Sequence, residues 1–444
     1  MKIIARLLAF LSVAASSLLY VKLKASWGLL VFPKLVVGAL APFTALIGAL
    51  GAGLGLLANA PLAVLAGTLG AVMSASHVRR VTAPQPGFEQ AFGSQWERAI
   101  APEQKTGMLQ RRWTWHMPAA PEPRWQRDVP FWTIPGTDRT LLCDLWQPPS
   151  GTTPSGLAFV YLHGSGGVML DKDFGTRPLF RHLAAQGHVV MDVAYRLFPE
   201  TDMLGMVGDT KRAIAWMKAH GADYGVNPDR VVVGGASAGG SLSLVAAYAP
   251  ADPALTPNDV READLSVRAV ISCYGPADTR ACYYHTKQDQ SRSPYYHYDP
   301  QRDQSRSPVQ RPPDTSDPAT ALIRTIMGPS YDRLGLANVR YVGALEPLLG
   351  GSPDTVPERY ALFSPITHVH PGCPPTLLIQ GEEDIITQVT VTNLLAEKLV
   401  AADVPTVNIV FPYTNHIFDM VLPRWSPAAQ TALYYEERFL ALMV

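Results

Sequence analysis

Residues 36–73 form a run of 38 residues without a charged side chain, and Asn59 and Pro61 interrupt it near its middle. The hydrocarbon core of a bilayer needs about 20 apolar residues per helix. The run is therefore long enough for nearly two spans joined by a tight turn at Asn59 and Pro61. We predict a membrane-spanning helical hairpin over residues 36–76, because a buried hairpin would need more cover than one soluble core usually provides.

The basic residues of the N-terminal segment predict its orientation. The first 88 residues contain no Asp or Glu and carry seven basic residues, whereas the rest of the chain has 30 basic and 37 acidic residues. Lys and Arg are enriched next to spans on the cytoplasmic side of a membrane. Five of the seven basic residues of the N-terminal segment lie at one end of the hairpin: Lys22, Lys24, Lys34, Arg79 and Arg80. Their position predicts that this end of the hairpin, and the remainder of the chain that follows it, is cytoplasmic. Residues 1–80 are therefore assigned to a membrane anchor.

The first apolar stretch, residues 3–20, leaves three alternatives open. It contains Arg6 and is only 18 residues long. It fits a third span, an interfacial helix or a signal-like segment. The number of spans therefore stays undecided at this point.

Charge and cysteine content argue against other classes of protein. The chain has 37 basic and 37 acidic residues, and this balance argues against a nucleic-acid-binding surface. Its four cysteines lie at scattered positions, so we expect free thiols rather than a disulfide framework. The glycine-rich segments lack the spacing of nucleotide-binding loops.

The remainder of the chain has the pattern of an α/β domain. Residues 81–130 are rich in Pro, Trp and Arg and are predicted to be a linker or cap segment with a few helical turns. Over residues 131–444, short apolar runs alternate with amphipathic segments, which predicts a mainly parallel sheet covered on both faces, with antiparallel first strands. The predicted strands are 131–134, 139–146, 157–162, 188–193, 230–234, 267–273, 375–380 and 406–411, and the predicted helices are 177–186, 205–220, 238–249, 388–402 and 426–442.

One segment departs from this alternation. YYHTKQDQSRSP at 283–294 is followed directly by YYHYDPQRDQSRSP at 295–308. This duplication is polar and has no apolar period, which predicts a surface loop. Its histidines and acids, among them His285, His297, Asp289 and Asp299, lack metal-ligand spacing on a regular element, so we expect no metal there. Residues 281–350 as a whole are predicted to be a cap or loop insertion.

The strongest catalytic motif is GASAG at 235–239, which follows an apolar run and precedes a helical segment. Small residues on both sides of Ser237 let a strand turn sharply into a helix and lift the serine oxygen above the sheet. The start of the helix adds free N–H groups and a partial positive charge. We predict that Ser237 is a nucleophile.

A second glycine-rich loop, HGSGG at 163–167, follows the strand at 157–162, and YRLFPE at 195–200 follows the next strand. Together with GGASAGGS, these motifs resemble the hormone-sensitive-lipase-like branch of the α/β-hydrolase superfamily over residues 131–444. The resemblance implies the α/β-hydrolase fold, with a central sheet of eight strands, and an oxyanion hole made by the amides of Ser165, Gly166 and Ala238.

The glycine-rich loop departs from the usual HGGG at Ser165. The amide survives this change, so the oxyanion hole is expected to survive unless the backbone there needs a positive φ. His163 is expected to stabilise the loop rather than to act as a base, because the base of the family comes late in the chain.

Two late loops complete the predicted site. The strand at 375–380 is followed by GEED at 381–384, and the strand at 406–411 by PYTNHIF at 412–418. A carboxylate and a histidine at the carboxyl ends of neighbouring strands can converge on the serine, in the chain order Ser, Asp, His. We predict that His416 is the general base and that Asp384 orients it, with Glu383 as the alternative acid. His368 and His370 are the competing late histidines.

These residues indicate a membrane-anchored serine carboxylesterase or lipase that works through an acyl-enzyme on Ser237. No cofactor and no metal is expected, and the predicted partners are a small-molecule or lipid ester and the membrane. The alternative is a non-catalytic ligand-binding member of the same fold, similar to the plant gibberellin receptor, which has lost the base. The presence of His416 favours the enzyme. The acyl group stays unassigned, because residues 81–130 and 281–350 show no readable pocket motif.

Overall fold

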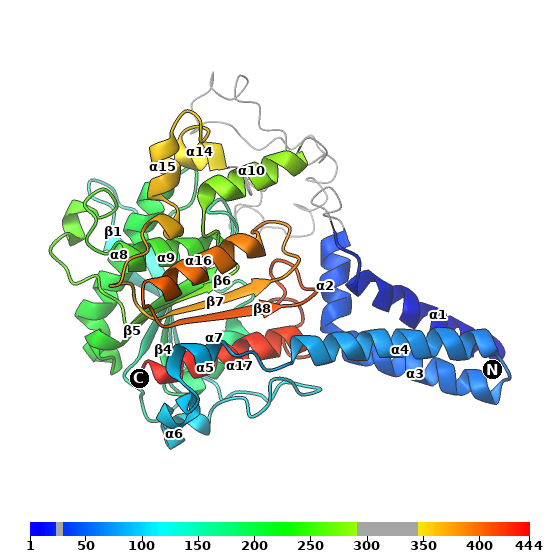
Figure 1. The fold of residues 1–444 in the computed structure, drawn as a ribbon. Helices are drawn as coiled ribbons and strands as arrows, with labels where there is room; N and C mark the ends of the chain where they lie inside the picture. Colours follow the sequence, from blue (N-terminus) through cyan, green and yellow to red (C-terminus); the bar gives the residue numbers. More distant parts are fainter. Residues whose placement is uncertain (24–29, 291–344) are drawn as a thin grey trace.

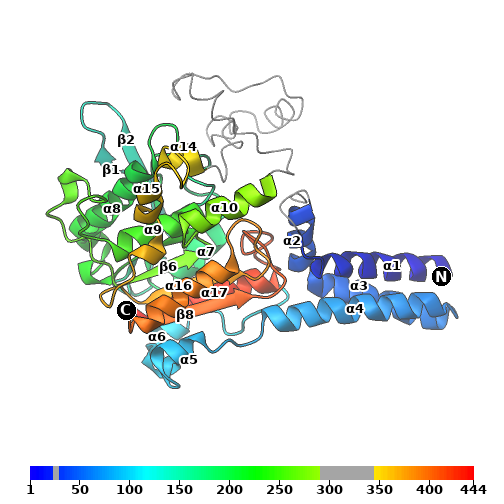
Figure 2. The same cartoon turned by 45° about the horizontal axis from the view of Figure 1, so that its top comes forward.

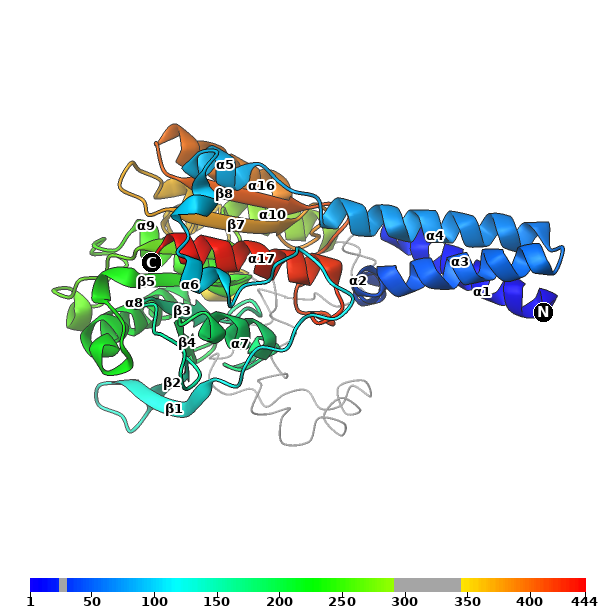
Figure 3. The same ribbon diagram turned by 90° about the horizontal axis from the view of Figure 1, so that it is seen from below.

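The computed structural model describes residues 1–23, 30–290 and 345–444. These residues form an α/β domain and an elongated bundle of N-terminal helices that projects from one side of it (Figure 1). The C-terminus lies on the α/β domain, whereas the N-terminus lies at the far end of the bundle (Figure 3). The segment predicted to be an anchor is therefore a distinct part of the molecule.

The α/β domain contains an eight-stranded sheet in the order β1-β2-β4-β3-β5-β6-β7-β8. The pairs β1–β2 and β2–β4 are antiparallel, and the remaining pairs are parallel. The strands are β1 (Arg124–Thr133), β2 (Thr140–Gln147), β3 (Ala158–Leu162), β4 (Val189–Val193), β5 (Val231–Ala236), β6 (Ala269–Cys273), β7 (Thr376–Gly381) and β8 (Thr406–Phe411). This topology confirms the predicted α/β-hydrolase fold and its antiparallel first strands.

Helices cover both faces of this sheet. They are α7 (Arg177–Ala185), α8 (Met203–His220), α9 (Ala238–Tyr248), α16 (Val389–Ala401) and α17 (Pro427–Leu442), with short turns η3 (Gly221–Tyr224), η4 (Pro228–Arg230), η5 (Asn258–Val260) and η8 (Pro365–Thr367). Strands β3 to β7 are buried at every position, as expected of a sheet covered on both sides. One face packs on α8, α9 and α16, and the other on α7 and α17.

The first strand begins earlier than predicted. β1 starts at Arg124, inside the segment assigned to a linker, and pairs with β2 from Arg124 to Thr133. Most of its residues before Val129 are exposed, because β1 is an edge strand. Exposed charged residues such as Asp128 conceal the alternation that would have indicated a strand. Before β1, the segment holds the predicted helical turns: α5 (Gly87–Phe92), η2 (Trp96–Ala99) and α6 (Pro102–Lys105).

Part of the predicted cap is helical. Its described elements are α10 (Thr279–Gln290) and α14 (Leu345–Leu349). The next helix in the chain, α15 (Pro357–Leu362), begins after the predicted cap, and the three helices lie close together in Figure 2. The first copy of the duplicated segment therefore begins as a helix rather than a loop, and its first residue, Tyr283, is buried and packs on Tyr360 of α15. Residues 291–344 lie outside the described residues, and with them His297, Asp299 and most of the predicted cap.

The N-terminal bundle contains α1 (Lys2–Leu19), α3 (Ala41–Leu57) and α4 (Pro61–Val81), with the short α2 (Val31–Ala39) at its base (Figure 1). The hairpin predicted over 36–76 corresponds to α3 and α4, but its first arm is broken, with a 73° bend between α2 and α3. Pro42, at the start of α3, accounts for the break, since proline cannot continue a helix that precedes it. By length and composition, α1 and α4 are each candidates to cross a membrane, as is the bent pair.

Small residues line the helix contacts of the bundle, and large apolar residues face outward. A Cβ on Gly48 would lie 2.6 Å from the Gly67 oxygen, and one on Gly51 would lie 2.7 Å from the Ala9 nitrogen. In contrast, Leu57 and Leu65 are 73% and 69% exposed. This arrangement is typical of helices that pack within lipid and is compatible with membrane association.

Candidate active site

Ser237 lies at the turn between β5 and α9, with φ 53° and ψ −121°. A positive φ is uncommon for a residue with a side chain, and close packing holds it here. A Cβ on Gly235 would lie 2.2 Å from the Leu162 oxygen, and one on Gly239 would lie 2.1 Å from the same atom. The two glycines are therefore steric requirements of the turn that presents Ser237.

Ser237, His416 and Asp384 form a continuous chain of hydrogen bonds. His416 Nε2 lies 2.9 Å from Ser237 Oγ, and His416 Nδ1 lies 2.7 Å from Asp384 Oδ2. Because the carboxylate accepts from Nδ1–H, Nε2 presents its lone pair to the serine hydroxyl. The structure thus brings together the three side chains that the sequence predicts, and it can support transfer of the serine proton to the imidazole.

Several donors hold Asp384 as a carboxylate. Its oxygens accept hydrogen bonds from Thr387 Oγ1 at 2.8 Å, from Gln380 Nε2 at 2.9 Å and from the Ile386 N–H at 2.8 Å. Burial alone would raise the pKa of Asp384, but His416 and the backbone donors hold this pKa below its ordinary value. The lowered pKa of Asp384 means that its carboxylate adds to the free energy of unfolding. This contribution is fully present above the ordinary aspartate pKa of about 4 and is lost as the pH falls through the lower pKa of the folded state.

Glu383, the alternative acid, bonds to Lys34 instead of to His416. Lys34 Nζ lies 2.5 Å from Glu383 Oε2 and donates to the Val21 oxygen at 2.8 Å. The side chains of Lys34 and Glu383 are only 2% and 10% exposed. This geometry favours Asp384 as the partner of His416. Since Lys34 belongs to α2, the N-terminal segment also contacts the loop that carries Asp384.

Breaking the Lys34–Glu383 pair is expected to reduce stability without removing the partner of His416. Glu383→Gln leaves the Lys34 ammonium buried without its carboxylate, a change that costs about 3 kcal/mol. The double variant Lys34→Met/Glu383→Gln is expected to recover most of this loss, because no buried charge remains. Denaturant unfolding of wild type, Lys34→Met, Glu383→Gln and the double variant in one detergent measures the coupling. A kcat loss in Glu383→Gln equal to that in Asp384→Asn would instead assign the acid role to Glu383.

The glycine-rich loop after β3 lies close to the serine. A Cβ on Gly164 would lie 3.1 Å from Ser237 Cβ. Within the described residues, the N–H groups of Ser165, Gly166 and Ala238 have no backbone or side-chain acceptor. These amides are therefore free to donate to a substrate oxygen.

Ser165 adopts a φ of 85°. From the sequence, we expect the oxyanion hole to survive the change from glycine to Ser165 unless the backbone needs such a positive φ. Its hydroxyl donates to the Gly164 and Met169 oxygens, and these bonds help to hold the loop in this conformation. Gly166 continues the left-handed path with φ 67°. The loop thus keeps its free amides despite the departure from HGGG.

Substitutions at Ser165 test this interpretation. Ser165→Gly is expected to keep esterase activity and to lose little stability, because relief of about 1 kcal/mol of backbone strain offsets the lost hydroxyl bonds. Ser165→Ala keeps the strain and loses the bonds, so it is expected to be less stable than wild type by about 1 kcal/mol. Melting temperatures and kcat/KM for a soluble ester measure both effects. A Gly variant less stable than the Ala variant would contradict the strain argument.

The other predicted histidines bond to backbone carbonyls. His163 Nδ1 lies 3.0 Å from the oxygen of the next residue, and its ring stacks on Tyr195 with centroids 4.6 Å apart. His368 and His370 each lie against a carbonyl, at 2.7 and 3.0 Å. In the described part of the chain, therefore, only His416 bonds to the serine.

Sequence reasoning missed a second support of the His416 loop. Tyr274 follows β6, and its ring centroid lies 4.6 Å from that of His416. Its hydroxyl donates to Asp419 Oδ1 at 2.7 Å. Tyr274 thus holds the His416 loop through its hydrogen bond to Asp419, which lies three residues after His416. The only signals in the sequence are a tyrosine after a strand and an acid near the base, which are too common to predict this pair.

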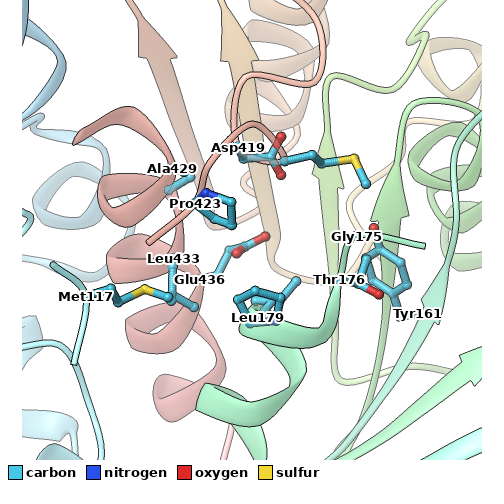
Figure 4. A pocket seen from close by; sticks show the side chains of 13 residues that line it. Met117, Tyr161, Gly175, Thr176, Leu179, Asp419, Pro423, Ala429, Leu433 and Glu436 are labelled. Atoms are coloured by element: carbon cyan, nitrogen blue, oxygen red, sulfur yellow. The ribbon is translucent and has the colours of Figure 1, made fainter. Parts of the chain in front are cut away.

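A small cavity of about 40 Å³ lies next to Asp419, and Figure 4 shows Asp419 and Glu436 among the residues around it. Burial raises the pKa of Asp419, and burial together with Asp419 raises that of Glu436 to about 8. Both shifts favour the neutral form of the Glu436 carboxyl. A cavity of this size has room for a water molecule.

Several known proteins are similar to this chain. A family model described as BD-FAE matches residues 143–306, which include the glycine-rich loop and Ser237 but neither Asp384 nor His416. The probable carboxylic ester hydrolase LipM of Mycobacterium tuberculosis is 28% identical over 303 residues, covering 67% of this chain and 57% of LipM. Esterase LipQ of the same organism is 26% identical over 296 residues, covering 66% of this chain and 57% of LipQ.

The chain therefore spans 57% of the length of these two relatives. Among solved structures, an esterase of Thermogutta terrifontis with propionate bound is 20% identical and has a TM-score of 0.48, covering 73% of this chain and 95% of that one.

Proposed function

We propose that this chain, as a member of the hormone-sensitive-lipase-like esterase branch of the α/β-hydrolase superfamily, hydrolyses carboxylic esters through an acyl-enzyme on Ser237, and its similarity to named ester hydrolases supports this proposal. The observation that carries this proposal is the hydrogen-bonded chain from Ser237 through His416 to Asp384. The names of the relatives LipM and LipQ support ester bonds as the substrate class.

The proposed reaction has two stages. Ser237 Oγ attacks the ester carbonyl carbon while His416 Nε2 takes the hydroxyl proton, and Asp384 stabilises the imidazolium. The amides of the glycine-rich loop and Ala238 donate to the oxygen as it gains negative charge. The imidazolium then gives its proton to the leaving alcohol. In the second stage His416 takes a proton from a water molecule, whose oxygen attacks the carbonyl carbon of the acyl-enzyme. The bond from this carbon to Ser237 Oγ then breaks, His416 returns the proton to Ser237 Oγ, and the acid is released.

A non-catalytic ligand-binding protein is the competing proposal. Such a protein has no need of a base within hydrogen-bond distance of a serine at a strained turn. Here His416 is buried, and its imidazole is oriented by Asp384 and packed by Tyr274. Backbone strain held at such a site is typical of catalysis, so we favour the hydrolase.

A labelling and turnover experiment tests the proposed function. The full-length protein in detergent is incubated with a fluorophosphonate probe, and labelled peptides are identified by mass spectrometry. In parallel, p-nitrophenyl esters from acetate to palmitate are assayed for release of nitrophenolate. We expect labelling of Ser237 and hydrolysis of at least one ester in the series. Stoichiometric labelling of a different serine would assign the nucleophile elsewhere.

We further propose that residues 1–80 anchor the chain and that the α/β domain is cytoplasmic. The outward apolar residues of the bundle support the anchor, and Lys22, Arg79 and Arg80 at the domain end of the bundle support the orientation. The full-length protein is expected to stay in the membrane fraction after a carbonate wash. Protease is expected to digest the α/β domain in inside-out vesicles and to spare it in right-side-out vesicles. The reverse result would overturn the orientation.

A further inference from the structure

The α/β domain carries exposed apolar side chains where it meets the base of the bundle. Trp115, Leu422 and Trp425, here called the apolar rim, are 50%, 36% and 41% exposed. The rings of Trp115 and Trp425 lie 5.8 and 6.3 Å from the ring of Phe43, which is in the first turn of α3. The apolar rim is therefore continuous with the outer apolar surface of the bundle.

The apolar rim shares a loop with the candidate active site. Leu422 and Trp425 lie on the loop between β8 and α17, the loop that carries His416. Ile417, directly after His416, is 37% exposed. This loop therefore exposes apolar side chains both next to the predicted base and at the rim.

The loop after β3 also exposes an apolar side chain, near the loop that carries His416. Phe174 is 41% exposed. A Cβ on the adjacent Gly175 would lie only 2.8 Å from the terminal carbon of Met420, so this loop touches the His416 loop. Two loops that reach the candidate site thus expose apolar side chains close to one another.

The position of the apolar rim along the bundle matches a membrane interface. The helix α4 ends with Arg79 and Arg80, at the same end of the bundle as Phe43. Arg424 is exposed within the loop that carries Leu422 and Trp425. Aromatic side chains next to arginines are typical of the headgroup level, where a ring contacts the apolar layer and a cation contacts phosphate.

We propose that the apolar rim lies in the membrane interface and that the active site takes its substrate from the bilayer. The substrate class is an amphiphilic ester with a long acyl chain, whose ester carbonyl lies at the depth of the headgroups. The bilayer is the occupant that the geometry favours, because the rim continues a bundle whose outer face is already apolar. This inference rests on the proposed ester hydrolysis for its chemistry, but the position of the rim is independent of catalysis.

The first experiment measures the position of the rim. Leu422→Cys is labelled with bimane in the full-length protein, since the native cysteines 143, 273, 282 and 373 are buried. The protein is reconstituted in phosphatidylcholine vesicles with and without brominated acyl chains. Val400→Cys on α16 is the matched control, because Val400 is an apolar residue that is 60% exposed on a different surface. We expect brominated lipid to quench the label at 422 and not at 400. Equal quenching at both sites, or none at 422, would overturn the proposal.

The second experiment measures substrate delivery. Wild type and Leu422→Asn/Trp425→Asn are assayed on p-nitrophenyl palmitate within vesicles and on soluble p-nitrophenyl acetate, with Leu394→Asn/Val400→Asn as the control. The rim variant is expected to lose at least about tenfold of its vesicle rate and less than about twofold of its acetate rate, because two apolar contacts with lipid are removed. The control is expected to keep both rates. An unchanged vesicle rate in the rim variant would overturn the inference.

The two experiments separate this inference from the proposed function. If wild type hydrolyses neither ester, the proposed function fails, while quenching at 422 still decides whether the rim lies in the bilayer. If a second protein or a second copy covers the rim instead, the label at 422 is protected from brominated lipid, and that outcome counts against the proposal.

Discussion

Ser237→Ala is expected to abolish ester hydrolysis while the protein keeps its fold. Removal of the nucleophile in a Ser-His-Asp site lowers kcat by about 10⁵ to 10⁶ fold. Alanine retains the Cβ at the strained turn and loses only the hydrogen bond to His416. The expected loss of stability is about 1 kcal/mol, so the melting temperature changes by only a few degrees. Hydrolysis of a soluble ester and thermal unfolding measure the two quantities.

Two further substitutions serve as controls for Ser237→Ala. Ser241→Ala removes a buried hydroxyl one turn into α9 that donates to the Pro276 oxygen at 2.9 Å, and it is expected to keep activity. Ser237→Gly is expected to be inactive but more stable than Ser237→Ala by about 1 kcal/mol, since glycine tolerates a positive φ. Wild-type activity in Ser237→Ala would show that another group carries the acyl chain.

The features predictable from the sequence are those fixed by local pattern. The predicted strand at 406–411 has the bounds of β8, and the apolar runs before Ser237 and Asp384 are the buried strands β5 and β7. Central parallel strands are apolar on both faces, so they appear as continuous runs in the sequence. The turn at Ser237 is equally local, because it needs small residues at fixed positions beside the serine.

The features that escaped prediction depend on contacts between distant residues. Lys34 and Glu383 are 349 residues apart in sequence. The sequence around either residue therefore does not indicate that the other residue is its partner. The same holds for the bond between Tyr274 and Asp419, which are 145 residues apart. Lys34 was interpreted as a charge that flanks a span, whereas the structure buries it against the loop that carries Asp384. A basic residue next to an apolar run therefore has two physical explanations that composition alone does not separate.

The edge strand β1 and the break before α3 escaped for different reasons. Most of β1 before Val129 is exposed, so its sequence lacks the apolar alternation of a strand with one buried face. The break depends on Pro42 within an apolar run, where the length of the run suggests a continuous helix and the proline ends it. For β1 the local signal is missing before Val129. For the break the local signal is present at Pro42, but the apolar average over the segment conceals it.

His416→Gln is expected to lower kcat by at least about 10³ fold, because the glutamine amide cannot take the proton of Ser237. Glutamine is close to histidine in size and can still donate to Asp384, so the variant tests proton transfer more than packing. In the wild type the imidazole lies between Asp384 Oδ2 at 2.7 Å and Ser237 Oγ at 2.9 Å. His368→Gln is the matched control, since that imidazole bonds to a backbone carbonyl at 2.7 Å and is expected to be dispensable for turnover. The measurement is kcat for a soluble ester with both variants in the same detergent. A loss of less than about tenfold in His416→Gln, with Ser237 still labelled, would place the base on another group.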